Sequence, residues 1–256
     1  MIFQYGRLWP DHPFCFRIPY QKLPGKNTAD REYKQCPPAI KSTVLNLLED
    51  LEDEEWIYWC IDDKYPIALN LRRLRALVKL IPDKLPPHIS GILFCRCRRM
   101  LEKEYLTGRK FYDNRRHCYL ERKDYNQIWI HQFVKVKVIR HLFMQFPDNI
   151  PYAKAMDTLI EKLQPPKSHS LYVTAKNLAT FGESTISGQL TLNCHQSLIH
   201  HGLPLPESLP LIHIQVTMGK NMSVWSHGIL KKKPVLWLRK AIYRSILRLK
   251  KRAIKA

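Results

Sequence analysis

The sequence predicts an α/β protein in which helices flank a central sheet that is mixed but mostly parallel. Two continuous apolar runs, at Trp56–Ile61 and Ile92–Cys95, lack polar alternation and so indicate strands that are buried on both faces. Apolar residues at helical spacing over 39–52 and 71–81 precede these two runs. Such an alternation of helices with buried strands is typical of a layered α/β domain.

In the first third of the chain, local signals place the ends of the predicted elements. A proline cannot continue a helix, so Pro10 ends a helix that includes Tyr5. Asn70 directly precedes a periodic apolar segment and is therefore a predicted N-cap. The expected elements are, in order, a helix end before Pro10, a strand at 14–18, a loop at 22–38, a helix at 39–52, a strand at 56–61 and a helix at 71–81.

Shorter signals predict the rest of the chain. Pro151 suits the first turn of a helix, Asn193 suits an N-cap, and Gly202 suits the position just after a helix. The expected elements are the strand at 92–95, β-like runs over 105–131, helices at about 133–146 and 151–163, a strand at 171–173, a polar loop at 181–188 and a helix from Asn193 to Gly202.

Composition limits the class of protein. The 256 residues suffice for one large domain, which we place at 1–230, followed by a basic tail at 231–256. Seven cysteines, an odd number spread along the chain, indicate free thiols in a reducing compartment. The N-terminus lacks a secretory pattern, and no apolar run approaches the ~18 residues that a membrane-spanning helix needs. We therefore expect a cytoplasmic protein.

The net charge of +20 is concentrated in the tail. Residues 231–256 hold eleven Lys and Arg and no acid, which leaves 31 basic and 22 acidic residues, or +9, for residues 1–230. A basic helix with an apolar stripe suits an anionic membrane surface and predicts peripheral attachment to the inner face of a membrane. The alternatives are a helix packed on its own domain and a segment that binds nucleic acid. The stripe consists of Leu238, Ile242, Ile246 and Leu249, with Trp237 beside it.

Asp62 and Asp63 directly follow the predicted strand at 56–61. In open α/β sheets the ligand crevice lies outside the carboxyl ends of the strands. Carboxylates that leave water need a cation or hydrogen-bond donors. The pair therefore predicts a site for a metal ion or a polar ligand. The alternative is a surface turn in which Lys64 forms a local ion pair.

Several short segments form one pattern: the helix 39–52 with Trp56–Ile61 and Asp62-Asp63, His131-Gln132, Gly182-Glu183-Ser184-Thr185, Gly188, Thr191 and Asn193. Together they resemble glycosyltransferases of the GT-A type, in particular a poorly characterised bacterial group. The resemblance covers roughly residues 8–205 and implies a single Rossmann-like GT-A domain. It also implies transfer of a sugar from a nucleotide-sugar donor to a polysaccharide or lipid-linked acceptor.

The resemblance implies a divalent cation, Mn²⁺ or Mg²⁺, held by Asp62 and Asp63. A departing nucleoside diphosphate leaves negative charge on a phosphate oxygen, and a hard cation with carboxylate ligands stabilises that charge. Lys64 is expected to add positive charge at the same place. The alternative for Lys64 is an ordinary exposed lysine.

Glu183 is the candidate general base, because activation of an acceptor hydroxyl needs a carboxylate or an imidazole within hydrogen-bond reach. Its alternative is a loop glutamate that caps backbone amides. Ser184, Thr185 and Asn193 are candidates for binding sugar hydroxyls or orienting Glu183, against ordinary turn and N-cap roles. His131 ends an apolar run and is a candidate metal or phosphate contact, against the alternative of a structural histidine.

The chain departs from the family pattern at its start. Members of the fold begin with a strand and loop that bind the nucleoside, whereas this chain begins partway through the first helix, near Tyr5. Either the start of the domain lies upstream, or the chain is a catalytically inactive relative. A nucleic-acid-binding protein is the other alternative function, favoured by the charge of +20. It is disfavoured because the sequence has no helix-turn-helix, zinc-finger or RNP signature.

Overall fold

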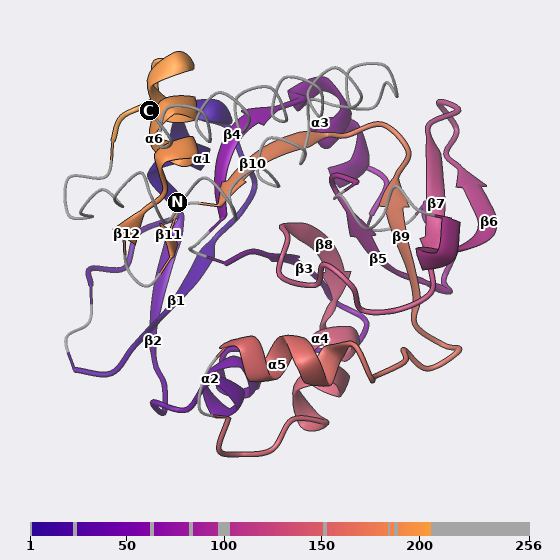
Figure 1. Ribbon diagram of the computed structural model, residues 1–256, viewed down its shortest axis with the longest axis horizontal. Helices are drawn as coiled ribbons and strands as arrows, with labels where there is room; N and C mark the ends of the chain where they lie inside the picture. The colour runs from indigo at the N-terminus through magenta and orange to yellow at the C-terminus, as the bar shows by residue number, and fades with distance from the viewer. Residues whose placement is uncertain are drawn as a thin grey trace, which may run out of the picture.

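The computed structural model of the chain describes residues 2–22, 25–61, 64–81, 84–96, 103–150, 153–183, 185–186 and 189–205. These residues form a six-stranded mixed sheet with helices on both faces, together with smaller two-stranded sheets (Figure 1). The α/β class and the mixed central sheet flanked by helices are therefore confirmed. The division into a domain at 1–230 and a tail at 231–256 stays a prediction, since the described part ends at Leu205.

The element bounds follow in chain order. The helices are α1 (Ile2–Leu8), α2 (Ile40–Leu47), α3 (Leu71–Val78), the 3₁₀ turn η2 (Lys103–Tyr105), α4 (Val136–Met144), α5 (Ala153–Ile160) and α6 (Leu192–His200). The strands are β1 (Phe16–Tyr20), β2 (Arg31–Gln35), β3 (Trp56–Trp59), β4 (Lys64–Leu69), β5 (Ile89–Leu93), β6 (Leu106–Tyr112), β7 (Cys118–Arg122), β8 (Gln132–Lys135), β9 (Ser170–Thr174), β10 (Ala179–Glu183), β11 (Thr185–Ile186) and β12 (Gln189–Leu190).

The central sheet has the strand order β3-β8-β5-β9-β7-β6. Among the described strands of this sheet, only β5 and β9 pair in parallel; the other four pairings are antiparallel. The expectation of mostly parallel pairing is therefore wrong. The physical reason lies in the connections: β6 and β7 form a hairpin, and β8 enters between β3 and β5 in the opposite direction to both.

The run at 56–61 is shorter and less buried as a strand than the sequence predicted. β3 covers Trp56–Trp59, lies at the edge of the sheet, and each of its side chains is partly exposed. Burial along the whole strand occurs instead in β5, near the centre of the sheet, where all five residues are buried. A continuous apolar run does not distinguish an edge strand from a central one, because other parts of the protein can also pack on both faces of an edge strand.

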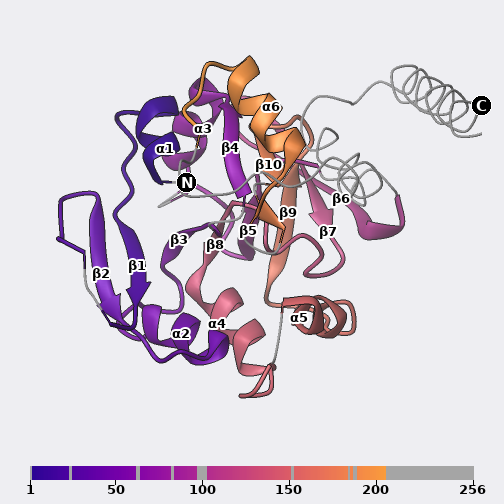
Figure 2. The ribbon, with the colours of Figure 1, turned by 60° about the vertical axis from the view of Figure 1, so that its left-hand side comes forward.

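Helices cover the two faces of the central sheet, as Figure 1 and Figure 2 show. On one face, α3 contributes Leu74 and Leu77 to a core that also contains Ile92 of β5. On the other face, α2, α4 and α5 share a second core with the opposite side of the sheet. The apolar residues whose periodicity predicted α2 and α3 therefore form the side of each helix that packs against the sheet.

A second β layer lies beside the central sheet and positions the candidate site. It consists of β4 paired antiparallel with β10, and α6 packs against it through Cys194 and Leu198 around Ile67 of β4. The sequence predicted neither strand: 181–188 was expected to be a polar loop, but β10 continues through Gly182 and Glu183. β2 was likewise missed within the expected loop at 22–38.

The helix ends agree in part with the capping predictions. The Asn70 side chain accepts a hydrogen bond from the backbone N of Arg73 (3.3 Å), which confirms it as the N-cap of α3. At α6 the cap is Thr191, whose hydroxyl oxygen accepts from the backbone N of Cys194 (3.2 Å), so the prediction of Asn193 as N-cap is wrong. Gly202 follows the helix with a φ of 60°, a conformation that favours glycine.

The described residues include no helix that is long and apolar enough to cross a membrane. The basic tail at 231–256, with its predicted apolar stripe, lies outside the described residues. Attachment of the tail to an anionic membrane surface therefore stays a prediction.

Candidate functional site

The pairing of β4 with β10 brings two predicted site segments together. In this antiparallel register Lys64, the first residue of β4, lies opposite Glu183, the last residue of β10. Asp62 and Asp63 directly precede Lys64, and Ser184 and Thr185 directly follow Glu183. The backbone thus places the end of the Asp62-Asp63 connection beside the residue predicted to be the general base.

The connection between β3 and β4 is closed by hydrogen bonds to one carbonyl group. The Ile61 carbonyl oxygen accepts from the backbone N of Lys64 (3.4 Å) and from Nε2 of His131 (3.0 Å). Asp62 and Asp63 lie between these described ends but outside the described residues themselves. The two ends of the connection are therefore close together, and one of them is held by a buried side chain.

His131 is fully buried and uses both ring nitrogens within the protein. A carbonyl oxygen can only accept, so the bond to Ile61 assigns the proton to Nε2 and leaves Nδ1 as an acceptor. Nδ1 lies 2.8 Å from the Tyr5 hydroxyl and 3.3 Å from the Tyr58 hydroxyl. The two hydroxyl groups also contact each other. The result is a buried chain of polar groups that ends at the Ile61 carbonyl.

The charge states in this network follow from burial. Burial lowers the pKa of His131 to about 3, with Lys64 acting in the same direction and the bond to Ile61 opposing it. Burial also raises the pKa of Tyr5 and of Tyr58 well above the ordinary value. Near neutral pH the imidazole is therefore uncharged, and both tyrosines keep their hydroxyl protons.

Aromatic contacts fix the His131 ring between several elements. The ring stacks on Tyr5 of α1 with centroids 5.8 Å apart, and it contacts Phe181 of β10 at 4.6 Å. Tyr58 of β3 meets it edge-on at 5.9 Å. His131 therefore touches α1, β3 and β10 at the point where the central sheet adjoins the second layer. This geometry favours the structural alternative for His131, since both ring nitrogens have protein partners.

The remaining predicted residues lie along the same layer. Lys64 is half-buried at the start of β4. Glu183, Thr185 and Asn193 are placed by their backbones, at the end of β10, the start of β11 and the first turn of α6 respectively. Ser184 lies outside the described residues. Glu183 is thus in a strand rather than in the polar loop that the sequence predicted.

The described side chains alone do not form a metal site. Among them, no group of three or more His, Cys, Asp or Glu side chains is arranged to hold a metal ion. His131 is not available as a ligand in this conformation, because both its nitrogens are hydrogen-bonded. Carboxylate oxygens are nevertheless the ligands that Mg²⁺ and Mn²⁺ prefer, so the residue types of Asp62 and Asp63 fit such an ion.

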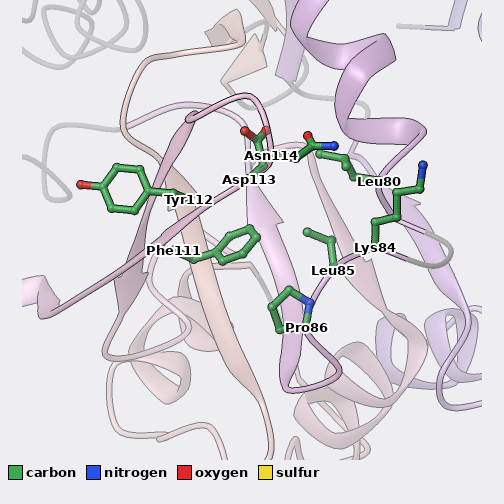
Figure 3. A pocket seen from close by; sticks show the side chains of 8 residues that line it. All are labelled: Leu80, Lys84, Leu85, Pro86, Phe111, Tyr112, Asp113 and Asn114. Atoms are coloured by element: carbon green, nitrogen blue, oxygen red, sulfur yellow. The ribbon is translucent and has the colours of Figure 1, made fainter.

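Two hollows are lined by residues other than the predicted site residues. One of about 330 Å³ contains the buried carboxylate of Asp113, and Figure 3 shows its lining: Leu80, Lys84, Leu85, Pro86, Phe111, Tyr112, Asp113 and Asn114. The other, of about 440 Å³, is lined by Phe14, Glu54, Glu55, Trp56, Tyr58, Val78, Ile81 and Phe133. Tyr58 joins the second hollow to the buried polar chain, since its hydroxyl belongs to that chain.

Neither the polar partners of His131 nor those of Asp113 were predicted from the sequence. Tyr5 and Tyr58 had no signal as partners of His131, because residues so far apart in sequence meet only through the tertiary fold. Asp113 did carry a sequence signal, because an aspartate in a turn commonly accepts hydrogen bonds from backbone N–H groups a few residues later. Here Asp113 accepts from both the backbone N and the ring Nδ1 of His117.

A comparison of the chain with models of protein families, with characterised proteins and with solved structures found no match. The resemblance to GT-A glycosyltransferases therefore rests on the sequence motifs. The structural features that bear on function are the Ile61–Lys64 hydrogen bond and the β4–β10 pairing.

Proposed function

We propose that the chain is a metal-assisted glycosyltransferase that moves a sugar from a nucleotide-sugar donor to a polysaccharide or lipid-linked acceptor. One observation supports this most directly. The β4–β10 register puts Lys64, which follows Asp62 and Asp63, opposite Glu183. The residue types at and beside this end of the strand pair, two aspartates, a lysine and a glutamate, have the chemistry that such a transfer needs.

In the proposed reaction each residue has one task. Asp62 and Asp63 bind Mn²⁺ or Mg²⁺, which when bound stabilises the charge that develops on the departing diphosphate. Lys64 places a further positive charge near the phosphate groups. Glu183 accepts the proton of the attacking acceptor hydroxyl. Thr185, with its neighbour Ser184, and Asn193 bind sugar hydroxyls; Asn193 lies in the first turn of α6.

Ligand-dependent stabilisation tests the donor and metal part of this proposal. A ligand that binds only the native state at 100 times its dissociation constant stabilises that state by about 2.7 kcal/mol. For a protein of this size we expect UDP or another nucleoside diphosphate with Mn²⁺ to raise the Tm by roughly 5–10 °C. Asp63→Ala is expected to abolish the shift.

The matched control is Glu52→Gln, which removes an exposed carboxylate before β3 and should leave the shift unchanged. Glu183→Gln should keep the shift but lower the rate of sugar transfer or donor hydrolysis by at least roughly 100-fold, as expected for loss of a general base. If UDP, GDP, ADP, CDP and dTDP all leave the Tm unchanged in the presence of Mn²⁺, this function is wrong.

A further inference from the structure

We propose that the hollow beside the β6–β7 turn binds an acidic sugar unit of a polysaccharide acceptor. In this site Phe111 packs against the sugar ring, and Lys84 and Arg116 meet its negative charge. The inference rests on the proposed function, since it assigns the acceptor to one chemical class, the acidic polysaccharides. The hollow has a volume of about 330 Å³ and is lined by residues that follow α3 and by residues at the end of β6.

One wall of the hollow is apolar. Figure 3 shows the Phe111 ring pointing into the hollow toward Leu85 and Pro86, whereas Tyr112, the next residue of β6, points away from it. The buried Tyr119 ring stacks on Phe111 with centroids 5.5 Å apart and so supports it from below. A pyranose ring presents C–H groups on its faces, and these pack favourably against the electron-rich face of an aromatic ring. This wall therefore suits a sugar unit.

The turn supplies the polar end of the hollow. Asp113 lines it, but the carboxylate already accepts four hydrogen bonds from groups of the protein, so it holds the turn in place. The neighbouring Asn114 also lines the hollow and is exposed. Its amide offers both donors and an acceptor, which matches a sugar hydroxyl, since a hydroxyl group also donates and accepts.

The exposed charge around the hollow is positive. Lys84 lines the hollow and is exposed, and Arg115 and Arg116 are exposed in the turn. Among the described side chains that line the hollow or belong to the 113–116 turn, the only carboxylate is that of Asp113, which is 1% exposed. A carboxylate or phosphate group on a sugar forms charge-assisted hydrogen bonds with such cations. The charge therefore favours an acidic sugar unit over a neutral one.

Arg116 has a backbone conformation that is costly for an arginine. Its φ is 58°, close to the 60° of Gly202, and residues with a Cβ atom rarely adopt such a value. Glycine adopts it without a steric cost. Strained backbone of this kind is found at sites where a particular side chain is needed. The arginine at this position thus indicates a task for its side chain beyond the formation of the turn.

A single-stranded nucleic acid also combines flat rings with negative charge. Proteins that bind it stack the bases on exposed aromatic rings. The exposed aromatic side chain of β6 is Tyr112, and it points away from the hollow. The ring inside the hollow, Phe111, is partly buried and stacked on Tyr119. These observations favour the sugar, and a nucleotide probe tests the choice.

The experiment measures the binding of trisaccharides to the full chain by calorimetry, without a sugar donor and with EDTA present. The acidic probes are the trisaccharides of galacturonate, mannuronate and glucuronate, and the neutral probe is maltotriose. We expect at least one acidic probe to bind at least about tenfold more tightly than maltotriose, the effect of one charge-assisted hydrogen bond. If none does, the inference is wrong.

Matched variants locate the binding site of that probe. Lys84→Met should weaken binding by about tenfold, whereas Lys123→Met removes the same charge at the other end of the β6–β7 hairpin and should change it by less than about twofold. Phe111→Leu should weaken binding by at least about threefold, and Tyr112→Leu should leave it unchanged. Equal effects of the two lysine variants, or of the two aromatic variants, overturn the inference.

Arg116→Gly separates a binding role from a structural one. Glycine suits the φ of this position, so we expect the Tm to stay the same or to rise. The affinity for the acidic probe should nevertheless fall by about tenfold, because a cation at the hollow is lost. Unchanged affinity overturns the assignment of Arg116 to the site.

The outcomes distinguish this inference from the proposed function. If UDP with Mn²⁺ does not bind but the acidic probe binds at the hollow, the glycosyltransferase proposal fails and the acidic-sugar site stands without an acceptor role. If UDP with Mn²⁺ binds and no acidic probe does, this inference alone fails. A uridine trinucleotide that binds more tightly than every trisaccharide, and less tightly to Phe111→Leu, assigns the hollow to nucleic acid and also overturns the inference.

Discussion

The Asp113 carboxylate organises the turn between β6 and β7, and its removal should be costly. The side chain is 1% exposed. Oδ1 accepts from the backbone N of Arg115 (2.9 Å) and of His117 (2.8 Å), and Oδ2 accepts from Nδ1 of His117 (2.8 Å) and from the Tyr119 hydroxyl (3.1 Å). Burial alone raises the pKa of Asp113, but these bonds outweigh it and hold the pKa below its ordinary value.

The magnitude follows from the four bonds. At about 1 kcal/mol each, Asp113→Ala should lower the free energy of unfolding by about 3–4 kcal/mol. At 2–4 °C per kcal/mol, the Tm should fall by roughly 6–16 °C. In Asp113→Asn the amide oxygen still accepts from the two backbone groups, and His117 can change tautomer to accept from the amide. That variant should therefore lose only about 1–2 kcal/mol.

Urea unfolding followed by circular dichroism measures these differences. The control is Asn114→Ala in the same turn, where the side chain is exposed and the expected change is within about 0.5 kcal/mol. Equal losses of unfolding free energy in Asp113→Ala and Asp113→Asn would show that the hydrogen bonds from the backbone N–H groups are not the main contribution of Asp113 to stability. A loss below about 1 kcal/mol in Asp113→Ala would refute the reasoning altogether.

Three further predictions concern other parts of the molecule. Burial lowers the pKa of His169 to about 4, below the value of about 6.5 in the unfolded chain. The contribution of the neutral imidazole to stability is therefore fully present above pH 6.5 and is lost as the pH falls toward 4. In urea titrations, His169→Phe should reduce the difference in unfolding free energy between pH 7 and pH 4 by about 3 kcal/mol. Thr191→Ala should lower the free energy of unfolding by about 1 kcal/mol, and Asn193→Ala by clearly less, since Thr191 is the N-cap; the reverse order would contradict this assignment. Deletion of 231–256 should abolish binding to anionic liposomes in a sedimentation assay, while binding of nucleoside diphosphate persists. If the deletion instead removes a salt-dependent binding of nucleic acid, the alternative of a nucleic-acid-binding protein is favoured.

The sequence was sufficient where a structural signal is local. Asn70 caps α3 because its side chain reaches an amide three residues away, and Gly202 ends α6 because its φ of 60° suits glycine. Local reasoning failed for α6 at its start: both Thr191 and Asn193 are good capping residues, and only the backbone decides which one precedes the first turn.

Long-range pairing explains the larger differences. β8 was merged with the helix that follows it, because Gln132–Lys135 continues an apolar pattern and only its two neighbouring strands make it a strand. β10 was taken for a loop because Gly182 and Glu183 are polar or flexible residues, and it is a strand because β4 supplies its partner. The resemblance gave Lys64 and Glu183 roles in one reaction, but their proximity follows only from the β4–β10 register.

The 61–64 connection joins two sheets that share no strand. β3 pairs with β8 in the central sheet, whereas β4 pairs only with β10 among the described strands. A second short connection, over residues 175–178, joins the same two sheets from β9 to β10, and within it the backbone N of Leu178 donates to the Phe94 carbonyl oxygen (2.7 Å). A molecule that binds the β4–β10 pair is thus anchored to the central sheet through both connections.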